Sequence, residues 1–157
     1  MKIGIVIHSQ SGATANVAKK LDAALTARGH DVDTTLLRTA GRVKPRNTSF
    51  EIRNAPPAEP FDAIVVGGPV WAFTISPVIL KYAKGLGKLT GKKALCFVTK
   101  GLPFAWTGGN NALRVLENGV SISNATICPG AIINTVNARS GTALEPYITR
   151  MVTSLEG

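Results

Sequence analysis

The sequence has little cysteine and contains no apolar run long enough to cross a membrane. Its two cysteines, Cys96 and Cys128, lie in apolar segments and form no C-x-x-C motif or Cys/His ligand spacing. This excludes a disulfide framework and favours two buried, unreactive thiols over a redox or metal role. No run approaches the roughly 18 apolar residues of a membrane span, and the N-terminus lacks the cleavage pattern of a secretory leader. We therefore expect a cytoplasmic protein without a membrane span.

Acidic side chains are also scarce, which leaves a strongly basic chain. Against 18 Lys and Arg there are 9 Asp and Glu, so the formal net charge is +9. Part of the excess lies in one stretch, opposed there only by Glu51. Its basic residues are Arg38, Arg42, Lys44, Arg46 and Arg53. Such a stretch favours an acidic protein partner, an anionic membrane surface or nucleic acid, or it serves solubility alone. The sequence argues against nucleic acid, because no nucleic-acid module is recognisable and the aromatic residues are not interleaved with the charges.

The length and the apolar content indicate one folded domain over residues 1–157. A chain of 157 residues, 45% of them apolar, buries roughly two-thirds of its unfolded surface. That is enough for a self-sufficient core.

An apolar strand at residues 3–7 runs directly into a polar loop and then into an amphipathic helix with Val17, Leu21 and Leu25 on its apolar face. The loop residues are Ser9, Gln10, Ser11, Gly12, Ala13 and Thr14. Backbone N–H groups and hydroxyls at a helix N-terminus suit a phosphate dianion. No Lys or Arg lies between Ser9 and Asn16, so binding would rely on dipoles. The plain alternative is a turn that caps a helix.

Strands and helices alternate along the rest of the chain. Further strands are expected at residues 30–37, 61–68, 93–99 and 126–136, and helices at 78–86, 110–117 and 142–155. The prolines and missing periodicity of residues 39–60 leave any helix there short or absent. The alternation predicts an α/β fold, a three-layer doubly wound sandwich with a five-stranded parallel sheet.

Two further loops follow strands that should end at the same sheet edge as the first loop. The loop after the third strand contains Pro69, Val70, Trp71, Ala72 and Phe73. The loop after the fourth contains Thr99, Lys100, Gly101, Phe104, Trp106, Gly108 and Gly109. Both tryptophans and two of the five phenylalanines therefore flank one predicted cleft. A planar heteroaromatic ring held between aromatic faces explains this placement.

Three motifs carry a resemblance to a known family. They are S-x-S-G-x-T after the first strand, G-G-P-V-W-A after the third and T-K-G with T-G-G after the fourth. They resemble the three FMN loops of the flavodoxin family, over nearly the whole chain and closest to the short-chain type. The resemblance implies the strand order 2-1-3-4-5 and FMN as cofactor, with its phosphate on residues 9–14 and its isoalloxazine ring between residues 69–73 and 99–109. Trp71 would stack on the ring, with Trp106 or Phe104 on the other side; packing over the sheet is the alternative role for Trp71 and Phe104.

The resemblance implies an electron carrier that acts between protein partners, with an acidic partner favoured by the basic charge. The alternative is an FMN-dependent NAD(P)H:quinone-type oxidoreductase, because the cofactor supplies the redox chemistry and no catalytic residue is required. No residue stands out as a general acid or base. His8 is expected to be a hydrogen-bonded structural residue, and His30, in a turn, to be solvated. A phosphorylated receiver domain is disfavoured, because Gly67 and Gly68 stand where its aspartate would be and His8 and Ser9 where its acidic pair would be.

Overall fold

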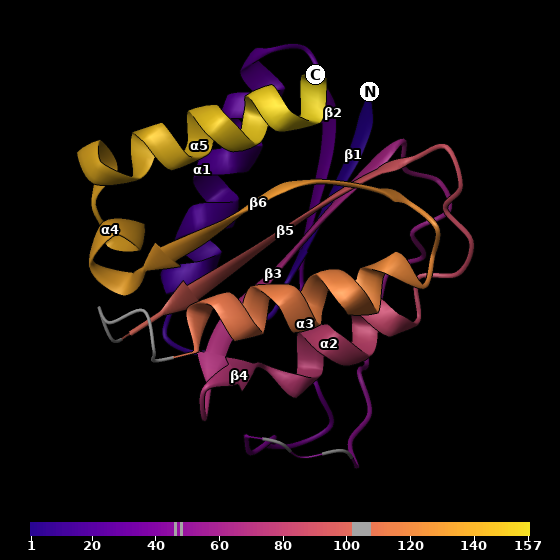
Figure 1. Cartoon of the computed structure of the whole chain (residues 1–157), viewed down its shortest axis with the longest axis vertical. Coiled ribbons are helices and arrows are strands. Elements are labelled where there is room, and N and C mark those ends of the chain that lie inside the picture. The colour runs from indigo at the N-terminus through magenta and orange to yellow at the C-terminus, as the bar shows by residue number, and fades with distance from the viewer. Residues whose placement is uncertain (46, 48, 102–107) are drawn as a thin grey trace.

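The computed structural model describes residues 1–45, 47, 49–101 and 108–157. Figure 1 shows one twisted sheet between two layers of helices. The strands are β1 (Lys2–Ile7), β2 (Asp31–Leu36), β3 (Ala63–Trp71), β4 (Thr74–Ile75), β5 (Lys93–Lys100) and β6 (Thr126–Asn134). The helices are α1 (Ala13–Ala27), α2 (Pro77–Lys84), α3 (Gly109–Ser121), α4 (Thr135–Arg139) and α5 (Gly141–Glu156).

The long strands pair in the order β2-β1-β3-β5-β6, and every neighbouring pair is parallel. Because β4 is only a short antiparallel addition to β3, this is the order 2-1-3-4-5 that the resemblance implied. The fold prediction is therefore confirmed. In such a sheet the carboxyl ends of β1, β3 and β5 share one edge, and the strand order reverses between β1 and β3.

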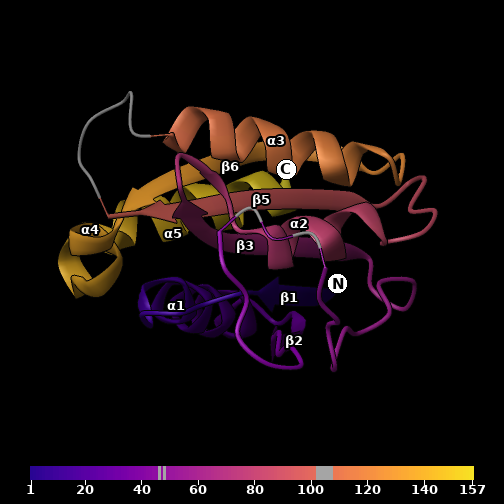
Figure 2. The same cartoon turned by 90° about the horizontal axis from the view of Figure 1, so that it is seen from below.

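Two apolar layers hold the sandwich together. Alternate residues of β1 point to opposite faces, as strand geometry requires. Ile3, Ile5 and Ile7 pack in the layer under α1 and α5, whereas Val6 packs in the layer under α2 and α3. Figures 1 and 2 show the same division, with α1, α4 and α5 on one face and α2 and α3 on the other.

Gly67 and Gly68 do not end their strand as predicted; β3 continues to Trp71. Their role is close packing. A Cβ atom on Gly67 would lie 2.3 Å from ring atoms of Phe97, and one on Gly68 would lie 2.6 Å from Cγ2 of Ile79. Glycine in a strand often marks such a close approach, so these residues thin the strand instead of turning the chain.

The cysteine prediction is confirmed, since Cys96 in β5 and Cys128 in β6 are both buried free thiols. Burial raises the pKa of each thiol, which keeps it protonated and unreactive. Among the described residues, no helix combines the length and apolarity that a bilayer crossing requires.

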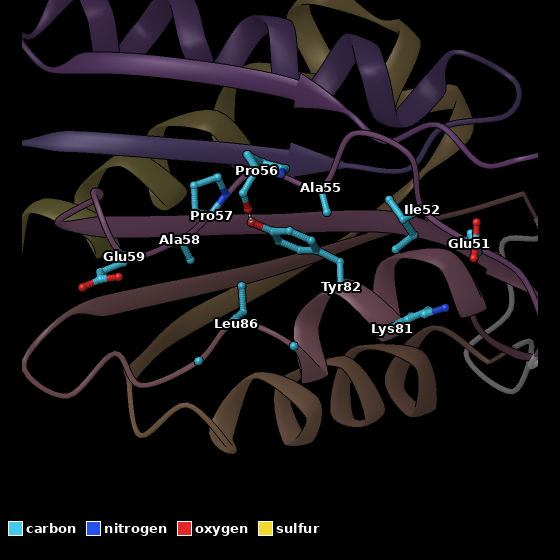
Figure 3. Close-up of a pocket in the computed structure, with 12 residues that line it drawn as sticks. Glu51, Ile52, Ala55, Pro56, Pro57, Ala58, Glu59, Lys81, Tyr82 and Leu86 are labelled. Carbon is cyan, nitrogen blue, oxygen red and sulfur yellow. Dashed lines mark hydrogen bonds between the residues drawn. The ribbon is translucent and has the colours of Figure 1, made fainter.

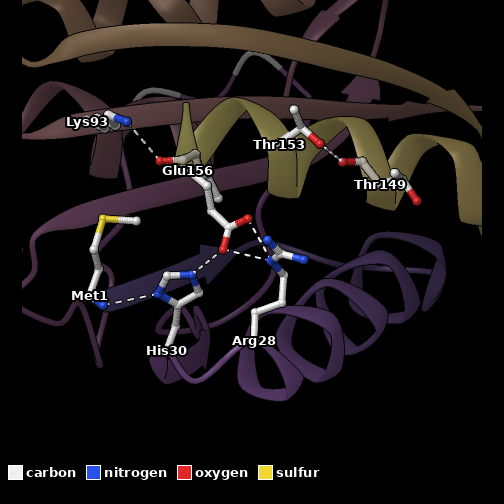
Figure 4. A network of polar contacts seen from close by, with 8 residues as sticks. Met1, Arg28, His30, Lys93, Thr149, Thr153 and Glu156 are labelled. Carbon is white, nitrogen blue, oxygen red and sulfur yellow. Dashed lines mark hydrogen bonds and ion pairs between the residues drawn. The ribbon is translucent and has the colours of Figure 1, made fainter.

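The prediction that His30 is solvated is wrong. Its side chain is 11% exposed; Nε2 lies 2.8 Å from Oε2 of Glu156, and Nδ1 lies 3.0 Å from the amino group of Met1. Figure 4 shows these contacts together with the ion pair between Arg28 and Glu156. Hydrogen bonds from Arg28 and His30 lower the pKa of the Glu156 carboxyl. The turn is covered because the end of α5 packs over it, which the local sequence does not reveal.

Candidate functional site

The loops after β1, β3 and β5 meet at the carboxyl edge of the sheet. Thr14 at the start of α1 and Thr99 at the end of β5 are buried, and their hydroxyl oxygens lie 2.8 Å apart. The loop after β3 meets the start of α3, where Asn111 Nδ2 donates to the Phe73 carbonyl at 3.3 Å. The structure thus brings together the three segments that the sequence predicted to share one site.

The first loop turns at Gly12, whose φ of 89° is left-handed. Glycine adopts this conformation without strain. Gly12 occupies the cap position of α1 and therefore offers no side-chain cap; Ser9 Oγ instead accepts from the Ala15 N–H at 3.2 Å. Ser11 is exposed, and the first turn of α1 contains no acidic residue. The loop joins an accessible hydroxyl to a helix N-terminus whose partial charge is positive.

Arg139 is a residue of this site that the sequence did not reveal. It ends α4, and its Nη2 donates to the Ser11 carbonyl oxygen at 3.3 Å across 128 residues of chain. Asn16 Nδ2 donates to the Ala138 carbonyl at 2.6 Å, which holds α4 against the start of α1. A guanidinium therefore stands beside a loop that has no cation of its own. The sequence features that could have indicated this short helix are its cap residues, Asn134 and Ser140.

Trp71 lies on a β-hairpin, not in an irregular loop. Val70 pairs with Ile75 and Trp71 with Thr74, and the two turn residues Ala72 and Phe73 have φ values of 49° and 67°. Positive φ at both turn residues suits a tight hairpin but disfavours non-glycine residues. The hairpin leaves Phe73 54% exposed and holds Trp71 partly buried.

His8 supports the Trp71 ring. The two rings meet edge to face at 80°, with 5.0 Å between their centroids. Nδ1 of His8 lies 2.7 Å from the hydroxyl oxygen of Ser76, a fully buried residue that caps α2. The prediction of a hydrogen-bonded structural histidine is confirmed. Burial lowers the pKa of His8, so the ring is held in its neutral form.

The lowered pKa of His8 predicts how the stability of the protein depends on pH. In the unfolded chain His8 takes up a proton at the ordinary histidine pKa of 6.5, whereas in the folded chain its pKa is lower. The free energy of unfolding therefore falls as the pH drops below 6.5 and through the lowered pKa. We expect His8→Asn to flatten this dependence, measured by urea unfolding at about pH 7.5 and about pH 5. Ser76→Ala, which keeps the titrating ring, should retain it; an unchanged slope in His8→Asn contradicts the prediction.

The loop after β5 is described at both ends. Thr99 is buried, Lys100 is partly buried, and Gly108 has a left-handed φ of 102°. A Cβ atom on Gly108 would lie 2.4 Å from the Phe73 carbonyl oxygen, so glycine lets this loop pack against the Trp71 hairpin. Gly109 opens α3. The predicted ring partners Phe104 and Trp106 lie outside the described residues.

A cavity of about 370 Å³ adjoins Trp71 and is partly formed by an unexpected segment. Its lining residues are Gln10, Val43, Pro45, Val70, Trp71 and Ala72. The basic stretch between β2 and β3, whose contacts the sequence did not reveal, therefore borders the predicted site.

A larger cavity, about 690 Å³, lies between residues 51–59 and α2 (Figure 3) and includes none of the predicted site residues. The Tyr82 hydroxyl there donates to the Pro56 carbonyl at 2.8 Å. Burial raises the pKa of Tyr82 to about 12, which keeps the phenol protonated. Among the described residues, the sheet edge joins the N-terminus of α1 to the aromatic ring of Trp71, whereas the lining of this cavity contains no helix N-terminus.

A parallel sheet in this order, covered by helices on both faces, is the flavodoxin fold. Flavodoxin 2 from Bacillus cereus matches with a TM-score of 0.74 at 18% identity, over 99% of this chain and 98% of that chain. The flavodoxin of Streptococcus pneumoniae TIGR4 matches with a TM-score of 0.72 at 14% identity, over 99% and 98%. A short-chain flavodoxin associated with a bacterial microcompartment matches with a TM-score of 0.70 at 16% identity, over 99% and 97%. A scan of protein-family models and a search of curated proteins find no match.

Proposed function

We propose that this protein binds FMN at the carboxyl edge of its sheet and carries electrons between protein partners. The observation that carries the proposal is the first loop: a left-handed Gly12 at the N-terminus of α1, an exposed Ser11 and no acidic residue in the first helical turn. Fold neighbours that are themselves flavodoxins support the same cofactor.

The donor set fits a flavin mononucleotide. Hydroxyls and peptide N–H groups of residues 9–14 would hold the phosphate, and Arg139 adds a positive charge beside them. Trp71, fixed by the hairpin and by His8, would cover one face of the isoalloxazine ring. Residues 99–101 and 108–109 would border its other side. When bound, FMN supplies reversible uptake of one or two electrons, and the chain supplies orientation and shielding from water.

The partner that we propose is an acidic redox protein, since the net charge of the chain is +9. Opposite charges on two partners increase the rate at which they meet and suppress wrong pairings.

FMN uptake tests the proposal. We expect the purified protein to be yellow, and the apo-protein to bind added FMN at one site with a dissociation constant below a micromolar and quenched flavin fluorescence. The loaded protein should pass electrons to a one-electron acceptor and show no NAD(P)H oxidation with a quinone. A colourless protein that takes up no FMN overturns the proposal, and fast NAD(P)H oxidation assigns the protein to the reductases instead.

The stacking role of Trp71 gives a separate prediction. Loss of base stacking costs about 1–3 kcal/mol, so Trp71→Ala should weaken FMN binding by roughly 10- to 100-fold. The affinity for riboflavin should fall by the same factor, because Trp71 would contact the isoalloxazine ring that both ligands share. Fluorescence titration with both ligands measures this, and Trp71→Phe is the control that retains an aromatic face. Unchanged affinity in Trp71→Ala would assign this side chain to packing alone.

A further inference from the structure

The proposed FMN site gives no role to the basic stretch between β2 and β3. We name it the basic loop and define it as residues 38–53, of which 46 and 48 lie outside the described residues. Its ends are held together, since the Arg53 N–H donates to the Arg38 carbonyl at 2.8 Å and Thr39 pairs with Ile52 in an antiparallel bridge. Asn54 closes the base, with Oδ1 accepting from the Arg38 N–H at 2.6 Å. The two ends of the basic loop are therefore held together at its base.

The basic loop is also fixed to the body of the protein beside the predicted flavin. Val43 is buried in the apolar layer under α2. Lys81 of α2 stands over the Phe50 ring, 4.9 Å from its centroid. Val43 and Pro45 share a cavity with Gln10 and Trp71. One side of the loop therefore borders the residues proposed to hold the cofactor.

The basic loop presents positive charge to solvent. Arg38, Arg42, Lys44 and Arg53 are all exposed. None of the four takes part in the ion pairs found among the described residues, which join Arg28 and His30 to Glu156. The loop contains one acidic residue, Glu51. Burial of Val43 explains how the loop is held, but it does not explain four exposed cations on a loop that borders the Trp71 cavity.

We propose that the basic loop is the docking surface for an acidic redox partner, which would receive electrons from the flavin edge beside Trp71. The inference rests on the proposed function and adds where the partner binds. Exposed charge close to the reacting group raises the encounter rate of oppositely charged partners by roughly 10- to 1,000-fold at low salt. Because the loop that carries these charges also lines the Trp71 cavity through Val43 and Pro45, a partner drawn to the loop is brought close to the proposed flavin site.

Inorganic oxidants of opposite charge test the location. In the FMN-loaded, fully reduced protein, the flavin gives one electron to each of two ferricyanide ions, which become ferrocyanide, and it releases two protons from neutral FMNH2 or one from anionic FMNH−. Stopped-flow rates are measured with anionic ferricyanide and with cationic hexaammineruthenium(III). At about 10 mM salt the screening length is about 30 Å, so the exposed charges of the protein act on the approaching oxidant with little screening. We expect the ferricyanide rate to fall and the hexaammineruthenium rate to rise as salt is added.

Two variants that remove equal charge separate the loop from net charge. R38Q/R42Q/K44Q neutralises the basic loop, and K20Q/K84Q/K88Q neutralises three exposed lysines outside the site. At low salt we expect the loop variant to slow the ferricyanide reaction by about tenfold and the control by less than about twofold. Equal slowing in both variants overturns the proposal, because the effect would then be that of net charge.

Binding probes separate the classes of partner. Poly-L-glutamate, a simple acidic polymer, should bind the loaded protein and lose at least about tenfold in affinity in the loop variant. Tighter binding of a single-stranded oligonucleotide, or NADPH binding that the loop variant abolishes, overturns the choice of an acidic protein. FMN titration of the unmodified protein and of each variant comes first. Failure of the unmodified protein to bind FMN refutes the proposed function, whereas intact FMN binding with unchanged oxidation rates in the loop variant refutes the docking surface alone.

Discussion

Ser11→Asp is expected to lower the affinity for FMN by about 100-fold or more and to leave the affinity for riboflavin within about threefold. A carboxylate about 4–5 Å from a phosphate dianion is disfavoured by about 3 kcal/mol or more at an effective dielectric of about 20, and about 1.4 kcal/mol is a factor of ten. Riboflavin carries no phosphate and does not meet this repulsion. Fluorescence titration of the apo-protein with the two ligands measures the difference.

The specificity of this effect depends on the position of Ser11, which is exposed at the tip of the first loop with its carbonyl held by Arg139. Ser11→Ala is the matched control. It would remove the hydrogen bond that we propose between the Ser11 hydroxyl and the phosphate, worth about 1.5–3 kcal/mol, and should lower the affinity for FMN roughly 10- to 100-fold without adding repulsion. If Ser11→Asp weakens FMN and riboflavin equally, the loop does not contact the phosphate and the orientation of the cofactor is wrong.

Phe97→Ala is expected to give the largest loss of stability, about 3–5 kcal/mol in the free energy of unfolding. The ring is completely buried in the middle of β5. It fills the space that Gly67 leaves open on the neighbouring strand, where the two residues are register partners. Adding the missing methyl in Gly67→Ala should cost about 2–3 kcal/mol by overpacking. Urea unfolding measures both values.

A double variant tests whether the two residues are coupled. In G67A/F97L the smaller side chain leaves room for the new methyl, so the combined loss should be at least about 1 kcal/mol smaller than the sum of the single losses. Gly141→Ala is the control for a glycine whose Cβ position has no described residue within 4 Å, and it should change stability by less than about 0.5 kcal/mol. Additive losses would show that Gly67 tolerates a methyl without pressing on the ring.

The fold was predictable because its signals are local and repeated. Residues 3–7, of sequence IGIVI, form a run without a polar side chain, which is typical of a parallel strand covered on both faces. Proline at the start of α2 and left-handed glycines before α1 and α3 delimit the helices. Strand order came from the motifs of three loops, not from hydrophobic pattern alone.

The parts that the sequence did not reveal depend on contacts between distant residues. Arg139 reaches Ser11 across 128 residues, from a helix too short to show a period. The local sequence predicts that His30 lies in an exposed turn, and only the position of α5 shows that it is covered. The extension of β3 through two glycines depends on Phe97 and Ile79, which no pattern within the strand indicates. The charges of the basic loop were evident, but nothing in the sequence around Val43 and Pro45 indicates that they direct it toward Trp71.

The corner formed by Met1, Arg28, His30 and Glu156 affects the order in which a nascent chain can fold. Residues 1–36 supply β1, α1 and β2 early in synthesis. The apolar cluster that these elements share with α5, and the ion pairs of Arg28 and His30 with Glu156, can form only after α5 has been made. Domains emerge from the ribosome N-terminal end first. The cluster that joins Leu21 and Leu25 to α5 is therefore completed late in synthesis, after much of the sheet has left the ribosome.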